Sequence, residues 1–151
     1  MTLEIRRVID ADEEAWSTLY AGYRSFYSLE DDASTVRRTW EWVSQGRHGL
    51  TGLVAVLDGS VVGLANLRRF ARPSTATIGL YLDDLFTAPE ARGAGVASGL
   101  LRETAAVAAA EGASVVRWIT ATNNAVARRV YDGVATATAW VTYDMKPSAT
   151  G

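Results

Sequence analysis

The spacing of apolar residues over the first fifty positions predicts one strand followed by two helices. Residues from Leu3 to Val8 alternate in polarity, as expected for a short strand. Asp10 can cap a helix, and the acidic residues of the next turn favour the positive helix end. The apolar positions of this helix recur at helical spacing: Trp16, Leu19, Tyr20, Tyr23 and Tyr27. A second helix follows a polar break and ends near Gly46.

Strand and turn signals fill the middle of the chain. Two apolar strands, Leu53 to Leu57 and Val61 to Leu67, flank the sequence Asp58-Gly59-Ser60, which is typical of a hairpin turn. After a turn at Pro73-Ser74, the pattern predicts another strand from Thr77 to Thr87.

The last third of the chain alternates between helix and strand. The expected elements are a helix from Gly95 to Ala110, a strand from Val115 to Thr120, a short helix from Asn123 or Asn124 to Gly133, and one or two strands within Ala135 to Met145. The element order β-α-α-β-β-β-α-β-α-β-β contains no repeat and no linker. It predicts one domain over residues 3–146, with residues 147–151 as a frayed tail.

Composition narrows the class of protein. Apolar residues make up 48% of the 151 positions, which favours a packed core over disorder. The net charge of −2 disfavours a nucleic-acid partner, and no apolar run is long enough to span a membrane. The first four residues lack a basic region and an apolar segment, so we expect no signal peptide. Without cysteine, and with His48 as the one histidine, thiolate and multi-histidine metal sites are excluded. We therefore expect a cytoplasmic protein that binds no metal, no membrane and no nucleic acid.

Small residues surround the start of the long alanine-rich helix. They leave the backbone bare, so that a ligand can approach it closely: Gly93, Ala94, Gly95, Val96 and Ala97 follow Arg92. Free N–H groups and the positive dipole end make a helix start an anion site, and a diphosphate is its natural occupant. A flexible surface loop is the alternative interpretation.

Two familiar glycine-rich motifs do not fit this segment. The phosphate loop of nucleotide triphosphatases needs a lysine after its last glycine, and no lysine follows Gly95. The dinucleotide fingerprint would need glycine at Ser98. The pattern Arg/Gln-x-x-Gly-x-Gly/Ala does fit, at Arg92, Gly95 and Ala97, and it resembles the acetyl-CoA pyrophosphate loop of the GNAT superfamily of N-acetyltransferases.

The resemblance extends over residues 3–146 and is strongest from Tyr81 to Trp140. Two blocks, Tyr81 to Phe86 and Trp118-x-Thr120 with the downstream Asn124, Ala127, Arg128 and Tyr131-Asp132, look like those of diamine (spermidine/spermine) acetyltransferases and yeast histone and polyamine acetyltransferases. The sequence departs from them at Gly133 and at Ala139-Trp140. The resemblance implies an α/β (α+β) fold with a mixed sheet of six to seven strands flanked by about four helices.

Acetyl-CoA would be the cosubstrate, and the resemblance assigns its binding to three regions. The diphosphate would lie on residues 92–97, and the backbone of Leu85, Phe86 and Thr87 would hold the pantetheine arm and polarise the carbonyl. Asn124 would meet that arm or order its loop. A plain helix cap is an equally good interpretation of this asparagine.

Acetyl transfer needs a proton acceptor for the amine and a donor for the departing thiolate. By resemblance Tyr131 is the donor, by proton transfer or by a hydrogen bond to sulfur, although a structural tyrosine is the alternative. Asp83 aligns with the acidic residue credited with the base role. In a regular strand Asp83 and Asp84 point to opposite faces, and Asp84 shares its face with Leu82 and other apolar residues. A bulge in this strand is expected, and it could bring both carboxylates to the cleft, while local pairing of either one is the alternative.

An acidic and aromatic segment could receive a cationic acceptor. Tyr27, Glu30 and Asp31, together with Asp83, are the expected substrate-binding residues, although a solvated acidic loop beside core aromatics explains the same pattern.

The sequence therefore predicts an N-acetyltransferase that acetylates a primary amine of a small molecule, such as a polyamine or an amino acid. Acetylation of a protein N-terminus or lysine, and a non-catalytic acyl-CoA-binding module, are the alternatives. A homodimer is expected, because the apolar strands within Ala135 to Met145 would form an edge that needs cover.

Overall fold

The structure is a computed structural model that describes residues 1–149. Its strands are β1 (Leu3–Arg7), β2 (Leu50–Leu57), β3 (Ser60–Arg72), β4 (Thr77–Thr87) and β5 (Val116–Arg117). Its α-helices are α1 (Glu13–Phe26), α2 (Ala33–Gln45), α3 (Val96–Glu111) and α4 (Ala125–Asp132), and its 3-10 turns are η1 (Asp10–Asp12), η2 (Arg47–Gly49) and η3 (Pro89–Ala91). The chain divides into a compact unit from Met1 to Ile119 and a second unit that begins at Thr120.

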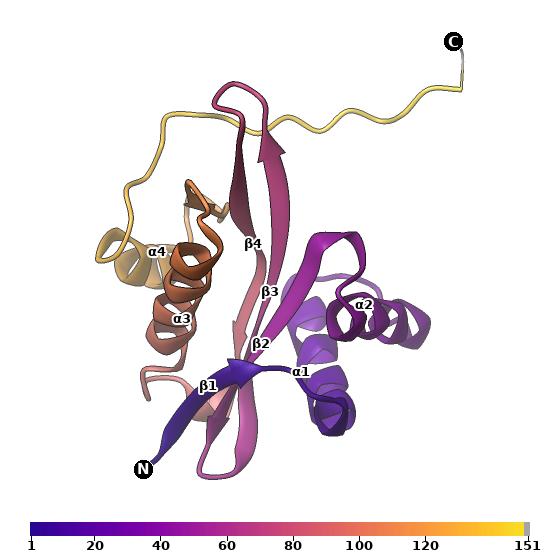
Figure 1. Ribbon diagram of the computed structural model, residues 1–151. Coiled ribbons are helices and arrows are strands. Elements are labelled where there is room, and N and C mark those ends of the chain that lie inside the picture. Colours follow the sequence, from indigo (N-terminus) through magenta and orange to yellow (C-terminus); the bar gives the residue numbers. More distant parts are fainter. Residues whose placement is uncertain (150–151) are drawn as a thin grey trace. The chain divides into compact units, whose positions relative to one another are not determined.

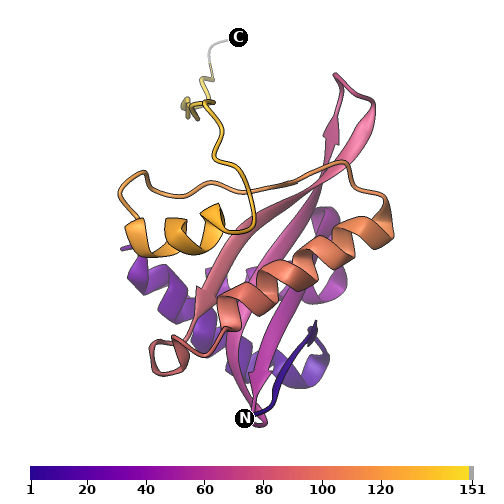
Figure 2. The ribbon, with the colours of Figure 1, turned by 90° about the vertical axis from the view of Figure 1, so that its left-hand side faces the viewer.

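The first unit is a mixed sheet covered by helices on both faces. The strand order is β1-β2-β3-β4-β5, with antiparallel pairs from β1 to β4 and a parallel pair between β4 and β5. Helices α1 and α2 cover one face and α3 covers the other (Figure 1). In Figure 2, α3 crosses the face of the sheet that is turned toward the viewer. The expected mixed α/β architecture is confirmed, with five strands among the described residues.

Local signals in the sequence set the helix ends. The Asp32 carboxylate accepts hydrogen bonds from the backbone N–H groups of Ser34 and Thr35, at 3.0 and 3.2 Å, and so caps α2. Hydrogen bonds from the side chains and backbone of these two residues lower the pKa of Asp32 to about 2. Gly46 ends α2 and Gly112 ends α3, both in the left-handed conformation that glycine adopts without strain.

Close packing fixes the start of α3 against the sheet. A Cβ atom on Gly63 of β3 would lie 2.6 Å from Cγ1 of Val96, the first residue of α3. Only a glycine therefore allows the helix to approach β3 at this point. Val96 is buried as a result, and this contact holds the first turn of α3 against β3.

The last two predicted strands differ from the structure. The strand expected from Val115 to Thr120 is only Val116–Arg117, and residues 135–145 are described without a strand. The side chains of Trp140 and Tyr143 are 87% and 90% exposed. The apolar alternation of this segment is genuine, but a strand needs the hydrogen bonds of a neighbour, and none of the described strands pairs with it. The expected sheet of six to seven strands is therefore too large.

The predicted tail lies partly beyond the described structure. Residues 147–149 form neither helix nor strand, and residues 150–151 lie outside the described residues.

Candidate active site

A β-bulge in β4 places the two adjacent aspartates. Asn66 of β3 pairs with Asp84, whereas the next residue, Leu67, pairs with Leu82, so that Asp83 is the extra residue of the bulge. Because neighbours on β3 point to opposite faces, Asp84 shares the face of Asn66, and Leu82 lies on the opposite face with Leu67. The bulge is as expected. The expectation that Asp84 shares a face with Leu82 is wrong, because it assumed regular alternation.

Asp84 is held in a buried network of hydrogen bonds. Its Oδ2 accepts from the Oη of Tyr20 at 3.1 Å and from Nδ2 of Asn66 at 2.9 Å. Burial raises the pKa of the Asp84 carboxyl, while hydrogen bonds from Asn66, Tyr23 and Tyr20 act in the opposite direction. Burial and the nearby Asp84 charge also raise the pKa of the Tyr20 and Tyr23 phenols. The raised pKa values keep the phenols protonated as donors, and burial favours a proton on the carboxyl against the effect of these hydrogen bonds.

Asp83 lies on the same face in a different electrostatic setting. Nε and Nη2 of Arg68 each donate to one oxygen of its carboxylate at 3.0 Å. Arg68 lies two residues along β3 from Asn66, so the donors to Asp83 and Asp84 come from one face of that strand. The Asp83 side chain is 27% exposed. Asp83 is thus an ion-paired, partly solvated carboxylate beside one that is mostly buried.

Strand β4 separates from its neighbour β5 just before the two aspartates. Its pairs with β5 are Leu80 with Val116 and Tyr81 with Arg117, and β4 then continues to Thr87. Among residues 1–149, no strand pairs with this edge past Tyr81. The predicted binding segment, Leu85, Phe86 and Thr87, lies there, so that edge has main-chain groups available for a ligand.

The start of α3 has the form expected for an anion site. Gly93 and Gly95 have φ values of 85° and 81°, and a Cβ atom at either position would meet nothing within 4 Å. Gly95 is the N-cap and supplies no side-chain hydrogen bond to the helix. The first N–H groups of α3 are therefore not capped by a side chain, and open space lies beside the two glycines.

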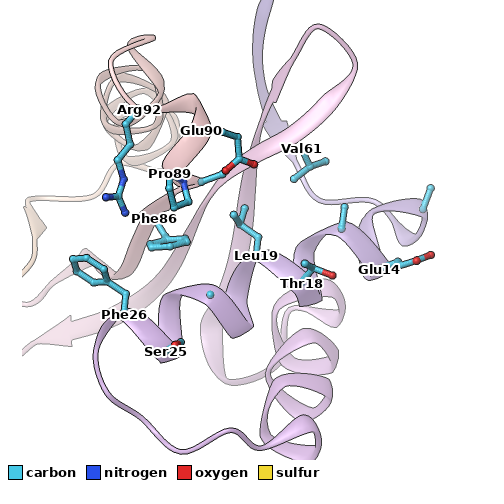
Figure 3. Close-up of a pocket in the computed structure, with 14 residues that line it drawn as sticks. Glu14, Thr18, Leu19, Ser25, Phe26, Val61, Phe86, Pro89, Glu90 and Arg92 are labelled. Carbon is cyan, nitrogen blue, oxygen red and sulfur yellow. The ribbon is translucent and has the colours of Figure 1, made fainter.

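Arg92 is directed toward a groove between α1 and the segment that follows β4. Figure 3 shows its side chain extending toward Phe26 and Phe86, and its guanidinium carbon lies 5.5 and 5.9 Å from their ring centres. The groove measures about 850 Å³, and Leu19 and Ala88 are among its apolar lining. Arg92 therefore connects the glycine segment to the aromatic end of α1.

The predicted acceptor-binding residues lie around the end of α1. The rings of Tyr20, Tyr23 and Tyr27 follow one another at 5.3 and 4.9 Å, which connects Tyr27 to the donor of Asp84. Glu30 and Asp31 line a separate cavity of about 310 Å³, in which Nη2 of Arg24 donates to the Glu30 carbonyl. The structure thus brings Tyr27 into the aromatic chain that ends at Asp84, and places the two acidic residues in the loop after it.

Asn124 and Tyr131 belong to the second unit. The Oδ1 of Asn124 accepts from the backbone N–H of Ala127 at 3.4 Å, so this residue caps α4. Tyr131 is half-buried in the last turn of α4, and its carbonyl accepts from the N–H groups of Val134 and Ala135. Both residues are thereby placed by the short helix that the sequence predicted.

Sequence reasoning missed the residues that partner the carboxylates. The helical spacing assigns Tyr20 to the core, Asn66 falls within the predicted strand Val61 to Leu67, and Arg68 lies just past the end of that strand. A buried asparagine among the apolar residues of β3 was the available signal, because a polar group in such a strand needs a partner.

Neither a metal-binding cluster nor a membrane-spanning helix is found in the described part of the chain. Residues 1–149 contain no group of three or more His, Cys, Asp or Glu side chains that could hold a metal ion. Within the same residues, no helix has the length and apolar character needed to cross a membrane.

Known proteins share this architecture. The family model described as "Acetyltransferase (GNAT) family" matches residues 15–133. A probable acetyltransferase has a similar structure, with a TM-score of 0.85 and 23% identity over 96% of this chain and 98% of that chain. A ribosomal-protein-alanine N-acetyltransferase from Brucella melitensis biovar Abortus 2308 gives a TM-score of 0.82 and 20% identity over 96% and 99%.

An aminoglycoside N-acetyltransferase in complex with CoA also has this fold. Its TM-score is 0.83, with 19% identity over 97% of this chain and 96% of that chain. No curated protein matches the sequence.

The buried carboxyl predicts a dependence of stability on pH. Because its pKa is raised on folding, Asp84 stabilises the folded state at low pH, and this contribution is lost as the pH rises through the folded-state pKa. Asp84→Asn cannot ionise. Its free energy of unfolding relative to the parent should therefore increase as the pH is raised above about 4, the ordinary range of an aspartate. Urea unfolding of both proteins over a pH series measures the difference.

Asp83→Asn is the matched control, because it removes a carboxylate that is paired with Arg68 and partly solvated. Its relative stability should show no such increase. A pH-independent difference for Asp84→Asn would contradict the effect of burial.

Proposed function

Because the chain belongs to the acetyltransferase (GNAT) family, we propose that it transfers the acetyl group of acetyl-CoA to a primary amine of a small molecule. The observation that carries the proposal is the uncapped start of α3, where two left-handed glycines leave open space beside free N–H groups. Acceptors of the proposed class include polyamines and amino acids. The blocks that resemble diamine acetyltransferases, above all Tyr81 to Phe86, support this class.

The proposed cosubstrate site follows the end of β4 into α3. Residues 92–97 would hold the diphosphate with their backbone N–H groups and the positive end of the helix. The main chain of Leu85, Phe86 and Thr87, on the edge of β4 past β5, would hold the pantetheine arm and donate to the thioester oxygen. Asn124 would contribute by ordering the segment before α4, which it caps.

The chemical step that we propose is direct attack of the neutral amine on the thioester carbon. The nitrogen–carbon bond forms, the carbon–sulfur bond breaks, and CoA leaves as a thiolate. The proton of the amine passes to a carboxylate, Asp83 or Asp84, directly or through water, and Tyr131 donates to the sulfur. The raised pKa of the Asp84 carboxyl favours it as the proton acceptor, whereas the ion pair with Arg68 favours Asp83 as an electrostatic contact for the acceptor cation.

A homodimer in the cytoplasm is also part of the proposal. Trp140, Val141 and Tyr143 are each at least 74% exposed, and large apolar side chains in an extended segment favour pairing with a second copy. The mass measured by light scattering at micromolar concentration should be that of two chains, and a monomeric mass would contradict the dimer.

Gly95→Glu should abolish most of the affinity for CoA. The side chain would enter the open space beside the start of α3, and its carboxylate would repel the diphosphate at the point where the helix dipole should attract it. Calorimetric titration of CoA measures the effect. Since Gly95 has a φ of 81°, the matched control is Gly112→Glu, which places the same residue at a φ of 71° with the same open space but at the other end of α3.

The control should retain CoA binding even if it loses stability. Unchanged affinity of Gly95→Glu would overturn the assignment of residues 92–97.

Tyr131→Phe should lower turnover by roughly 10- to 1000-fold while leaving the affinity for CoA nearly intact. The substitution removes only the hydroxyl, and a donor to the departing sulfur acts in the transition state rather than in cosubstrate binding. Release of free thiol in the presence of a primary amine measures the rate. A variant as active as the parent would make Tyr131 a structural residue of α4.

A further inference from the structure

Two arginines and two aromatic residues lie further along the sheet face that carries the two aspartates. The register pairs Arg68 with Tyr81 across β3 and β4, and Tyr81 with Arg117 across β4 and β5, so that these three residues form one row. Phe70 lies two positions along β3 from Arg68, on the same face. We name these four residues, Arg68, Phe70, Tyr81 and Arg117, the cationic shelf.

The four side chains of the shelf contact one another in series. The guanidinium carbon of Arg68 lies 4.6 Å from the ring centre of Tyr81, and the rings of Tyr81 and Phe70 meet edge to face at 5.9 Å. The guanidinium carbon of Arg117 lies 5.5 Å from the ring centre of Phe70. Each arginine is therefore oriented by a ring, and less rotational freedom is lost when it binds a ligand.

The two arginines differ in what they can still bind. Both Nε and Nη2 of Arg68 donate to Asp83, so its charge is compensated. Arg117 is exposed, and within residues 1–149 no carboxylate lies at ion-pair distance from it. The next arginine on this face, Arg72, donates to Ser114 nearer the end of the hairpin. The shelf thus offers one uncompensated guanidinium, which is suited to a carboxylate or another anion.

The position of the shelf relates it to the proposed acceptor site. Tyr81 and Asp83 are two positions apart on β4, about 7 Å along a strand. An acceptor whose nitrogen reaches the aspartates and whose chain extends along this face would bring its far end to Arg117. A second cation at that end would face the uncompensated guanidinium of Arg117, whereas an anion would be paired with it.

We propose that the acceptor is an amine that carries an anionic group at its far end, an ω-amino acid in its simplest form, and that Arg117 binds this group. The inference rests on the proposed function and narrows its class of acceptor, because that function includes both polyamines and amino acids. The Asp83–Arg68 pair would then separate the cationic and anionic ends of the bound acceptor.

Three acceptors of equal chain length test the proposal: 6-aminohexanoate, its amide 6-aminohexanamide, and 1,6-diaminohexane. With acetyl-CoA, the parent should show a kcat/KM for 6-aminohexanoate about tenfold above that for the amide, as expected for one charge-assisted contact, and higher still relative to the diamine. Arg117→Gln should remove this preference, so that the ratio of hexanoate to amide falls to about 1.

Arg72→Gln is the matched control, because it makes the same change of charge on the same face at a greater distance from Asp83. It should leave the ratio at its parent value. Arg117→Lys keeps the charge without the planar fork and should retain part of the preference, which provides a second variant if Arg117→Gln does not fold. A parent that prefers the diamine, or a ratio that survives Arg117→Gln, would overturn the proposal.

Binding without turnover separates this proposal from the proposed function. Calorimetric titration of 6-aminohexanoate into the CoA-saturated protein should show binding that Arg117→Gln weakens about tenfold. Binding of this kind without acetyl transfer would support the shelf and contradict the proposed function. Acetyl transfer to all three amines without preference would support the proposed function and overturn the shelf.

Discussion

The bulge at Asp83 is the constraint on which the arrangement of the candidate site depends. A regular β4 would send its two carboxylates to opposite faces, one toward α1 and one toward α3. The extra residue turns both to the face of α1, where Tyr20, Asn66 and Arg68 supply donors. The pairing of β4 with β5 ends at Tyr81, two residues before the bulge. The two carboxylates and the unpaired edge of β4 therefore lie in one short segment.

Burial of Asp84 in turn ties α1 to the sheet. A carboxylate removed from water needs hydrogen bonds, and the phenols of α1 provide them from a stack of rings that begins at the fully buried Trp16. The same series of aromatic residues continues to Phe26 and Phe86, against which Arg92 lies. One aromatic network therefore contacts both the buried carboxylate and the first residue of the glycine segment.

The two ends of the proposed reaction centre differ in electrostatic character. The start of α3 offers N–H groups and a positive dipole end, which suits the diphosphate of the proposed cosubstrate. On the sheet face covered by α1, a mostly buried carboxyl and an ion-paired carboxylate lie beside the cationic shelf, so acidic groups of β4 and basic groups of β3 and β5 are neighbours there. Such a face can orient an acceptor with charges of both signs, and this is the chemical basis of the substrate class that we propose.

Local sequence determined most of the elements and the glycine-rich form of the start of α3. Alternation and helical spacing placed β4 at Thr77–Thr87 as the structure has it, and Gly46 marked a helix end, because capping and periodicity act within one turn or one strand. The glycine-rich residues 93–97 could be recognised in the sequence for the same reason, because a left-handed glycine before a helix depends only on neighbouring residues.

Features that depend on partners distant in the sequence could not be predicted. The alternation within Ala135 to Met145 suggested strands, but only a neighbouring strand could have made them so. The partners of the aspartates come from α1 and β3, 64, 18 and 15 residues away in sequence. Tertiary structure alone decided that Asp84 is mostly buried while Asp83 is ion-paired, because the side-chain alternation of β4 changes at a bulge whose position depends on the register of β4 with β3.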